Sequence, residues 1–271
     1  MTSRLPSLAD RRHYLRAALG MAAASRRVIL GRMAAGFSRR LKADASLVTE
    51  ADLEAEQVLR AQVRRRFPEH GILGEEFPAY RPEADFQWIL DPIDGTLSFT
   101  HGLPFFGTII GLHFRGRPIV GVIDHPALGV RYGAGLGLGA WRDGQRLRLR
   151  DARAADLSRE IVSASDRPRF ALCRSAASFD ALVRAHANVR GYTDCLAHTL
   201  AAEGKIGAAV DFGVRLWDIA ATQLLIEEAG GRYACVYHGQ HRGLPLYGII
   251  CGKPRVVRWL LRVFSHRRPV R

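Results

Sequence analysis

The chain has 271 residues, of which 48% are hydrophobic and 24% are charged, and it carries a formal net charge of +14. This hydrophobic content excludes a disordered polypeptide and is sufficient for one large or two smaller packed domains. No apolar run approaches the roughly 20 residues that a membrane-spanning helix requires.

The positive charge comes almost entirely from arginine, because lysine occurs only at Lys42, Lys205 and Lys253. An excess of this size is typical of proteins that bind nucleic acid or anionic membranes. Arginine-rich usage is also expected from a GC-biased coding sequence, and a positive field would attract phosphorylated substrates. We therefore do not expect nucleic acid as a partner.

The cysteines and the N-terminal segment bear on the cellular compartment. The cysteines are widely separated and lack the paired spacing of metal ligands, so we expect reduced thiols in a cytoplasmic protein. An alanine-rich run at residues 17–25 is short and is flanked by arginines, which predicts a first helix rather than a signal peptide.

The first half of the chain is predicted to contain two helices followed by strands. Apolar residues recur with helical spacing at residues 8–36 and 50–66, and Thr49 is a good cap for the second helix. Asp143-Gly144 predicts a hairpin turn. Short apolar runs punctuated by glycines predict strands at about 86–90, 107–114, 118–124 and 129–134.

The second half alternates strands with helices, which predicts layered sheets and helices. The final helix belongs to a basic tail at residues 255–271, and its single apolar face is expected to pack on the core rather than to bind a membrane or RNA. The predicted elements are strands at 160–164, 206–211, 232–236 and 246–251 and helices at 176–186, 194–203, from about 216, and at 254–264.

One apolar strand is predicted to stop on two carboxylates, Asp91 and Asp94. Pro92 restricts the backbone of Asp91, and Gly95 allows a turn into a helix at Thr96 whose free N–H groups would face a phosphate. Carboxylates, waters and a phosphate are the ligands that Mg²⁺ takes. By itself, the pattern Asp-Pro-x-Asp-Gly is equally typical of an ordinary turn.

Two further acidic segments favour a metal site. Glu75 and Glu76 follow a short apolar run and a glycine, and Asp218 is predicted to lie in the first turn of a helix, where a carboxylate meets the positive dipole end. Taken alone, Glu75 and Glu76 fit solvated charges in a loop, and Asp218 fits an acid that stabilises the start of a helix. The three segments together are much more specific.

With these motifs the chain resembles the inositol monophosphatase-like family of Mg²⁺-dependent phosphatases, from about residue 10 to about residue 255. The resemblance implies an α/β fold of layered α+β type, a five-layered αβαβα sandwich. It places most metal ligands in an N-terminal α+β half, residues 1–150, and Asp218 and the substrate contacts in a C-terminal α/β half, residues 151–271. The matching segments are residues 48–52, 74–76, 91–96 and 217–221 with 228–231.

The resemblance also implies a ligand set for two Mg²⁺ ions. Glu75, Asp91 and the backbone carbonyl of Ile93 would bind the first ion. Asp91, Asp94 and Asp218 would bind the second. A third ion, held more weakly in some family members, would rely on Glu75 and water.

The catalytic roles implied by the family lie next to these ligands. The phosphate would sit on the N–H groups of Gly95 and Thr96, Thr96 with Glu75 would orient the attacking water, and Asp52 would hydrogen-bond Thr96. Phosphate monoester hydrolysis requires a barrier reduction well over ~20 kcal/mol, which two metal ions can help to provide. We expect in-line attack by metal-activated water without a phosphoenzyme.

Weaker signals favour the histidinol-phosphatase-like branch of the family. Ser98 stands where the family usually has Asn, and residues 102–108, 124–128 and the entry segment 42–52 resemble that branch. Asp194, which also fits a helix cap, and Asp211 are the candidate substrate contacts. Two acids would suit the ammonium of an amino alcohol such as histidinol, and they would equally accept hydroxyls from inositol.

We therefore expect a small phosphate monoester as the partner, with histidinol phosphate as the substrate and inositol 1-phosphate as the alternative. The resemblance is also compatible with a homodimer. The alternative from another class is a regulatory protein of this fold that binds nucleic acid or protein. Loss of metal carboxylates would have favoured it, but Glu75, Asp91, Asp94 and Asp218 are all present.

Overall fold

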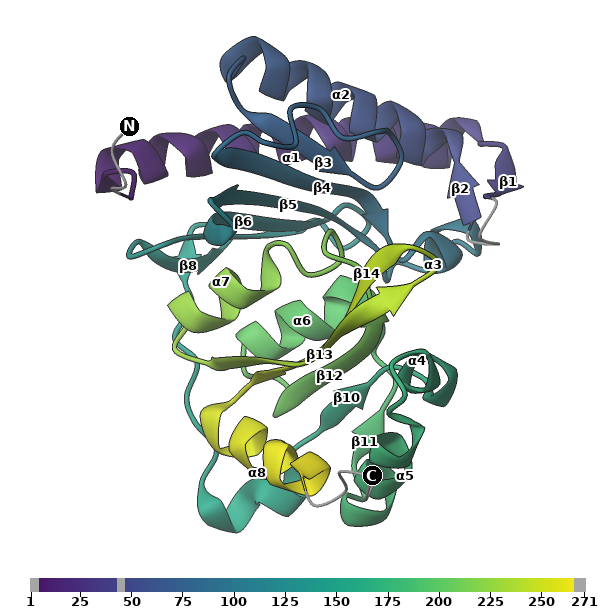
Figure 1. The fold of residues 1–271 in the computed structure, drawn as a ribbon, viewed down its shortest axis with the longest axis vertical. Coiled ribbons are helices and arrows are strands. Elements are labelled where there is room, and N and C mark those ends of the chain that lie inside the picture. Colours follow the sequence, from purple (N-terminus) through teal and green to yellow (C-terminus); the bar gives the residue numbers. More distant parts are fainter. Residues whose placement is uncertain (1–4, 43–46, 266–271) are drawn as a thin grey trace.

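The computed structural model describes residues 5–42 and 47–265. Two helices, α1 (Leu8–Ala35) and α2 (Glu50–Arg66), lie side by side across one face of a large sheet (Figure 1). Both begin with capping boxes, in which Ser7 pairs with Asp10 and Thr49 with Asp52. A small antiparallel pair, β1 (Arg39–Leu41) and β2 (Leu47–Thr49), precedes α2.

The first sheet has seven strands in chain order, with β3 parallel to β4 and all later neighbours antiparallel. The Asp143-Gly144 hairpin is confirmed, and both residues have the positive φ that a two-residue turn of this type requires. The strands are β3 (Gly71–Gly74), β4 (Phe86–Asp94), β5 (Gly107–Phe114), β6 (Arg117–His125), β7 (Val130–Gly135), β8 (Gly139–Arg142) and β9 (Gln145–Arg146).

The second sheet has five strands in the order β11-β10-β12-β14-β13. Its strands are β10 (Val162–Ala164), β11 (Val189–Arg190), β12 (Ala208–Val214), β13 (Arg232–His241) and β14 (Leu244–Gly252). Helices α6 (Asp194–Ala202) and α7 (Thr222–Glu228) lie between the two sheets (Figure 1).

The outer face of the second sheet is covered by α4 (Arg167–Leu172), α5 (Ala176–Ala185) and α8 (Pro254–Ser265), which share one buried cluster with it. The layers therefore follow the order helix, sheet, helix, sheet, helix, and the predicted αβαβα sandwich is confirmed (Figure 1). The short helices α3 (Thr96–Thr100) and η1 (Ala154–Arg159) complete the described elements.

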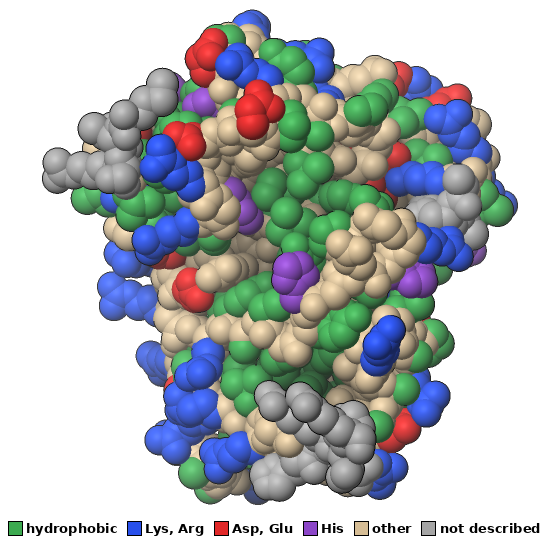
Figure 2. All heavy atoms as spheres, in the orientation of Figure 1, with side chains coloured by type: hydrophobic (Ala, Val, Ile, Leu, Met, Phe, Trp, Pro, Cys, Tyr) green, Lys and Arg blue, Asp and Glu red, His purple; other side chains and the backbone are tan. Residues whose placement is uncertain are grey.

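The last helix packs as predicted, since α8 buries Val256, Val257 and Leu260 against the second sheet. Residues 266–271 of the basic tail, and residues 43–46 of the entry segment, lie outside the described residues. Figure 2 shows Lys and Arg side chains spread around the edges of one face, with hydrophobic side chains towards its middle. Across residues 5–42 and 47–265, no helix has the length and apolar character needed to cross a bilayer.

The strand predicted at 232–236 extends to His241, and the one predicted at 206–211 runs from Ala208 to Val214. Two further differences in bounds affect the candidate site. The strand expected to stop at residue 90 continues through both carboxylates to Asp94. The helix expected to contain Asp218 in its first turn begins only at Thr222. Asp218 instead lies in a turn that its own side chain closes, because Asp218 Oδ2 accepts the N–H of Arg215 at 2.8 Å.

Candidate metal and phosphate site

Three carboxylates converge where the first sheet meets the turn before α7. Asp91 and Asp94 come from the end of β4 and Asp218 from that turn, and one ligand oxygen of each lies within 4.8 Å of the others. Asp91 Oδ1 is, within the described part of the chain, the one buried side-chain oxygen or nitrogen without a hydrogen-bond partner. An oxygen-only cluster with an unpartnered buried oxygen fits a hard cation such as Mg²⁺.

The electrostatics of the three carboxylates point the same way. Burial, together with the like charges of Glu75 and Asp94, holds the pKa of Asp91 well above its usual range. Burial and the charge of Asp194 do the same for Asp94. Burial and Glu75 raise the pKa of Asp218 to about 7. A cation bound among these groups would offset both the desolvation and the mutual repulsion.

Glu75, in the loop after β3, is not one of the three acids within 4.8 Å of one another, but its charge acts on both Asp91 and Asp218. A lysine binds its carboxylate. Lys42 Nζ donates to Glu75 Oε1 at 2.8 Å and to Glu76 Oε1 at 2.7 Å. Burial opposes the charged form of Lys42, but the two carboxylates outweigh it and raise the pKa of Lys42. Sequence reasoning missed this contact, although Lys42 is one of only three lysines in an arginine-rich chain.

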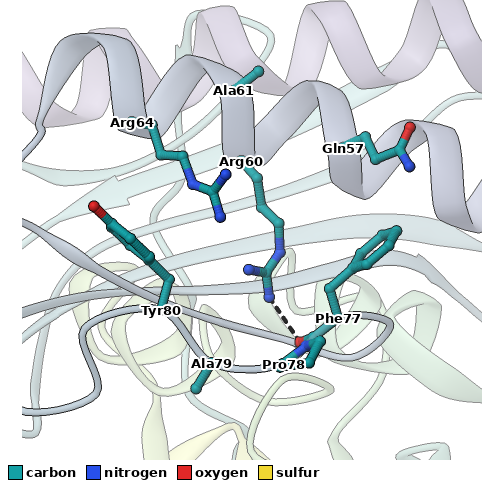
Figure 3. Close-up of a pocket in the computed structure, with 8 residues that line it drawn as sticks. All are labelled: Gln57, Arg60, Ala61, Arg64, Phe77, Pro78, Ala79 and Tyr80. Carbon is teal, nitrogen blue, oxygen red and sulfur yellow. Dashed lines mark hydrogen bonds between the residues drawn. The ribbon is translucent and has the colours of Figure 1, made fainter.

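The loop that carries Glu75 is anchored from α2. Glu56 accepts the N–H of Glu76 at 2.8 Å and Arg60 Nε at 2.7 Å, and Arg60 donates to the carbonyl of Phe77 at 2.8 Å (Figure 3). A groove of about 400 Å³ lies between α2 and residues 77–80. Asp91, Asp94 and Asp218 do not line it. It is lined by Gln57, Arg60, Ala61, Arg64, Phe77, Pro78, Ala79 and Tyr80.

Asp52 reaches the site through the cap of α2. Its Oδ2 accepts the N–H of Thr49 at 2.8 Å, which turns Oδ1 towards Thr96, whose Oγ1 lies 3.4 Å away. Thr96 Oγ1 also donates to the carbonyl of Ile93 at 3.0 Å. Burial raises the pKa of Asp52 to about 6 against the opposing hydrogen bonds from Thr49. The predicted Asp52–Thr96 neighbourhood is therefore present, and the catalytic roles stay predictions.

The turn at Gly95 lies close to Asp194, one of the two predicted substrate contacts. Gly95 has φ 87°, and a Cβ there would lie 2.9 Å from the carbonyl of Phe105 and 3.1 Å from Asp194 Oδ2. The carboxylate of Asp194 therefore lies directly against the turn predicted to bind phosphate. Asp194 is the first residue of α6, and Thr193 rather than Asp194 occupies the cap position.

Asp211, the other predicted substrate contact, lies on β12, where its Oδ2 is 3.2 Å from Nε2 of the buried His198. Burial raises the pKa of Asp194, and the nearby charge of Arg169 opposes that rise. Sequence reasoning also missed the N–H of Cys195, which donates to Asp94 Oδ2. A backbone donor supplied from another element leaves no signal in the residue pattern.

Comparisons with known proteins show the family of this chain. The sequence model of the inositol monophosphatase family matches residues 10–266. A histidinol-phosphatase from Chlorobaculum parvum is 39% identical over 195 residues, 72% of this chain and 73% of that protein. A Nus factor SuhB from Pasteurella multocida is 31% identical over 239 residues, 84% of this chain and 88% of that protein. The structure of an inositol monophosphatase from Zymomonas mobilis matches with a TM-score of 0.79 and 28% identity, over 96% of this chain and 100% of that one.

Proposed function

The chain belongs to the inositol monophosphatase family and is a phosphomonoester hydrolase, and we propose that its substrate is histidinol phosphate. The observation that carries this proposal is the carboxylate of Asp194, which lies against Gly95 and beside the metal carboxylates. An acid at this place would meet the alcohol that carries the phosphate. The similarity to a histidinol-phosphatase supports the same substrate.

The proposed metal ligands are Asp91, Asp94, Asp218 and Glu75, with the carbonyl of Ile93. When bound, Mg²⁺ supplies charge that stabilises phosphoryl oxygens and lowers the pKa of water. The number of ions, two with a third held weakly, is part of this proposal.

The remaining groups would orient the reactants. The single proton of the Thr96 hydroxyl is donated to the carbonyl of Ile93 or to Asp52, so Oγ1 keeps lone pairs that can accept a hydrogen bond from an attacking water. The N–H groups of Gly95 and Thr96 would bind the phosphate. Glu75 is placed to share the orientation of the water.

The charge around Asp194 favours a cationic alcohol. The acids Asp194 and Asp211 outnumber the one arginine whose charge acts on Asp194, Arg169, so an excess of negative charge remains there. An amino alcohol with one ammonium would balance it through charge-assisted hydrogen bonds. Inositol 1-phosphate is the second candidate, because the same oxygens accept hydroxyl groups and the solved relatives include inositol monophosphatases.

Phosphate release in the presence of Mg²⁺ tests the proposal. The substrates are histidinol phosphate, inositol 1-phosphate, fructose 1,6-bisphosphate and adenosine 3′,5′-bisphosphate. We expect the highest kcat/KM for histidinol phosphate, its selective loss by about 10-fold or more in Asp194→Asn, and the loss of all activity in Asp94→Asn. Asp151→Asn is the control, since Asp151 is an exposed residue near α8.

The outcomes separate the alternatives. A preference for inositol 1-phosphate would overturn the substrate and leave the metal site in place. Full activity in Asp94→Asn would refute the metal site. Absence of phosphate release from every substrate would favour a regulatory protein, the class to which the similarity to a Nus factor points.

A further inference from the structure

The strand that carries the metal ligands is irregular at the place where they lie. The register of β4 against β5 is interrupted between Asp91 and Asp94. Two residues of β4, Pro92 and Ile93, there oppose a single residue of β5, Thr108. Such a bulge removes ladder hydrogen bonds and re-aims the side chains on both sides of it. The direction of both carboxylates therefore depends on what holds the bulged peptides.

Pro92 cannot help to hold the bulge through an N–H, because proline has none. Its carbonyl is instead bound by a side chain: Thr108 Oγ1 donates to Pro92 O at 2.7 Å. Thr108 is fully buried, so water does not compete for this bond. Loss of the hydroxyl would leave a buried carbonyl without a partner and the peptide between Pro92 and Ile93 without its restraint.

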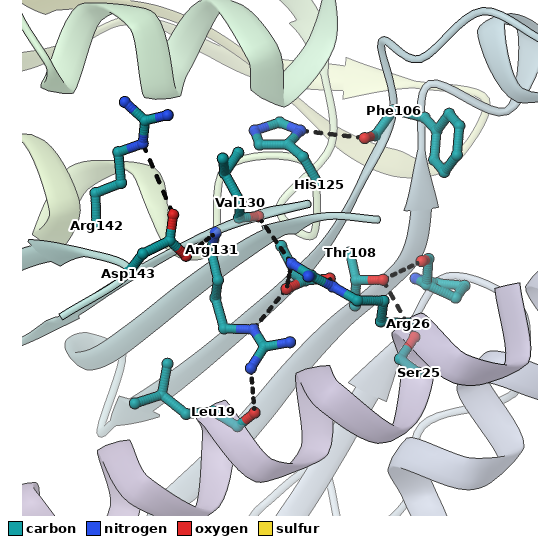
Figure 4. Close-up of polar contacts among 12 residues, drawn as sticks. Leu19, Ser25, Arg26, Phe106, Thr108, His125, Val130, Arg131, Arg142 and Asp143 are labelled. Carbon is teal, nitrogen blue, oxygen red and sulfur yellow. Dashed lines mark hydrogen bonds and ion pairs between the residues drawn. The ribbon is translucent and has the colours of Figure 1, made fainter. Parts of the chain in front are cut away.

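A second hydroxyl completes the chain of donors. Ser25, fully buried in the middle of α1, has its Oγ 3.1 Å from Thr108 Oγ1 (Figure 4). The single proton of Thr108 is already used on Pro92, so Ser25 must be the donor in this pair. The hydrogen bonds therefore run in one direction, from Ser25 to Thr108 to the carbonyl of Pro92.

The position of Ser25, where this series of hydrogen bonds begins, is itself fixed. Arg26, the next residue of α1, donates two hydrogen bonds to the fully buried Asp124 on β6, at 2.9 and 2.7 Å. Arg131 donates to the same carboxylate from the neighbouring strand, and also to the carbonyl of Leu19 (Figure 4). This network locks the rotation of α1 over the sheet, so the hydroxyl of Ser25 is presented to Thr108 in one position.

We propose that Thr108, supported by Ser25, is a positioning residue for the metal ligands Asp91 and Asp94 and the carbonyl of Ile93. This inference rests on the proposed Mg²⁺ site. The hydroxyl of Thr108 fixes the plane of the Pro92–Ile93 peptide, and that plane sets the directions of the ligands before and after it. A cation that requires near-ideal octahedral geometry is sensitive to small errors in those directions.

A merely structural role makes a different prediction. If the hydroxyl only satisfied a buried carbonyl, its removal would lower the free energy of unfolding without changing the affinity for metal. Direct metal binding to the metal-free protein therefore tests the proposal, by calorimetric titration with Mg²⁺ and by electron paramagnetic resonance with Mn²⁺. Thermal unfolding of each variant measures the stability separately.

The variants are chosen as matched pairs. Thr108→Val removes the hydroxyl and keeps the shape, whereas Thr108→Ser keeps the hydroxyl. Thr199→Val is the control, because Thr199 is also fully buried and its hydroxyl also has two partners. It donates to the backbone carbonyl of Leu196 at 3.0 Å and lies 3.0 Å from Nε2 of His125. We expect Thr108→Val to weaken the metal affinity about 10-fold, and Thr108→Ser and Thr199→Val to stay within about twofold of the wild-type protein.

Two results would overturn the proposal: wild-type affinity in Thr108→Val, or an equal loss in Thr199→Val, which would make the effect one of general stability. If Thr108→Val does not fold, Ser25→Ala decides. We expect it to weaken the affinity two- to threefold by freeing the hydroxyl of Thr108, and unchanged affinity in this variant would count against the proposal. Absence of metal binding by the wild-type protein would refute the metal site itself, which is a distinguishable result.

Discussion

Asp91 is the residue at which metal binding and folding are predicted to conflict. The residue is 1% exposed, its Oδ1 has no hydrogen-bond partner, and the like charges of Glu75 and Asp94 act on it. Without a cation, ionisation of this buried carboxyl group opposes folding. We predict that Asp91→Asn raises the melting temperature in EDTA and abolishes the further rise that Mg²⁺ gives the wild-type protein.

The magnitude follows from the burial. Replacing a buried ion pair by hydrophobic residues of similar volume can stabilise a protein by about 1–4 kcal/mol. Because asparagine keeps a polar group that requires partners, we expect the lower end, about 1–2 kcal/mol. For a chain of this length that corresponds to about 2–8 °C. Mg²⁺ at about 100 times its Kd would stabilise the wild-type protein by about 2.7 kcal/mol, or about 5–10 °C.

Calorimetric melting in EDTA and in Mg²⁺ gives both quantities, with Asp151→Asn as a control carboxylate away from the site. The melting temperatures of Asp91→Asn and the wild-type protein should change order between the two conditions. A lower melting temperature of Asp91→Asn in EDTA would show that the site does not oppose folding. An undiminished Mg²⁺ shift in this variant would show that Asp91 is not a ligand.

Three further predictions concern the surroundings of the site. Lys42→Met should bind Mg²⁺ several-fold more tightly in calorimetric titration, because Lys42 competes for Glu75; weaker binding would contradict this. Arg60→Met should lower the free energy of unfolding, measured in urea, by about 3 kcal/mol, because it leaves the buried carboxylate of Glu56 without its ion pair. Arg64→Met, which loses only a contact with the ring of Tyr80, should lower it by less than about 1 kcal/mol. Equal losses in the two variants would refute the anchoring role of Arg60. Burial lowers the pKa of His70 to about 4, below the 6.5 of the unfolded chain. Between these two pH values the imidazole gains a proton only in the unfolded chain, so the free energy of unfolding falls as the pH falls from 6.5 to 4. The stability advantage of wild-type protein over His70→Gln should therefore shrink by about 2 kcal/mol across that range, after allowance for partial solvent access, and parallel pH profiles would contradict this.

Local sequence patterns predicted the features whose causes lie within a few residues. The cap of α2 is such a case, because Thr49 and Asp52 bind each other's backbone N–H groups three residues apart. The Asp143-Gly144 hairpin is another. The acids Asp91, Asp94 and Asp218 were predicted to lie together from their residue types and from the family resemblance, and the structure does bring them together. Asp218 was misplaced for the same local reason, since its pattern fits both a first helical turn and the turn that it closes with Arg215.

The contacts that hold the site in shape join distant residues, and no local pattern contains them. Lys42 and Glu75 are 33 residues apart, and Ser25 and Thr108 are 83 residues apart. What brings Thr108 to Pro92 is the register of β4 against β5. Side chains alternate between the faces of a strand, so a slip of one residue would turn the hydroxyl of Thr108 to the opposite face and leave the carbonyl of Pro92 without a donor. The residues proposed as metal ligands can thus be predicted from the sequence, whereas the directions of their side chains depend on a register that only the assembled sheet defines.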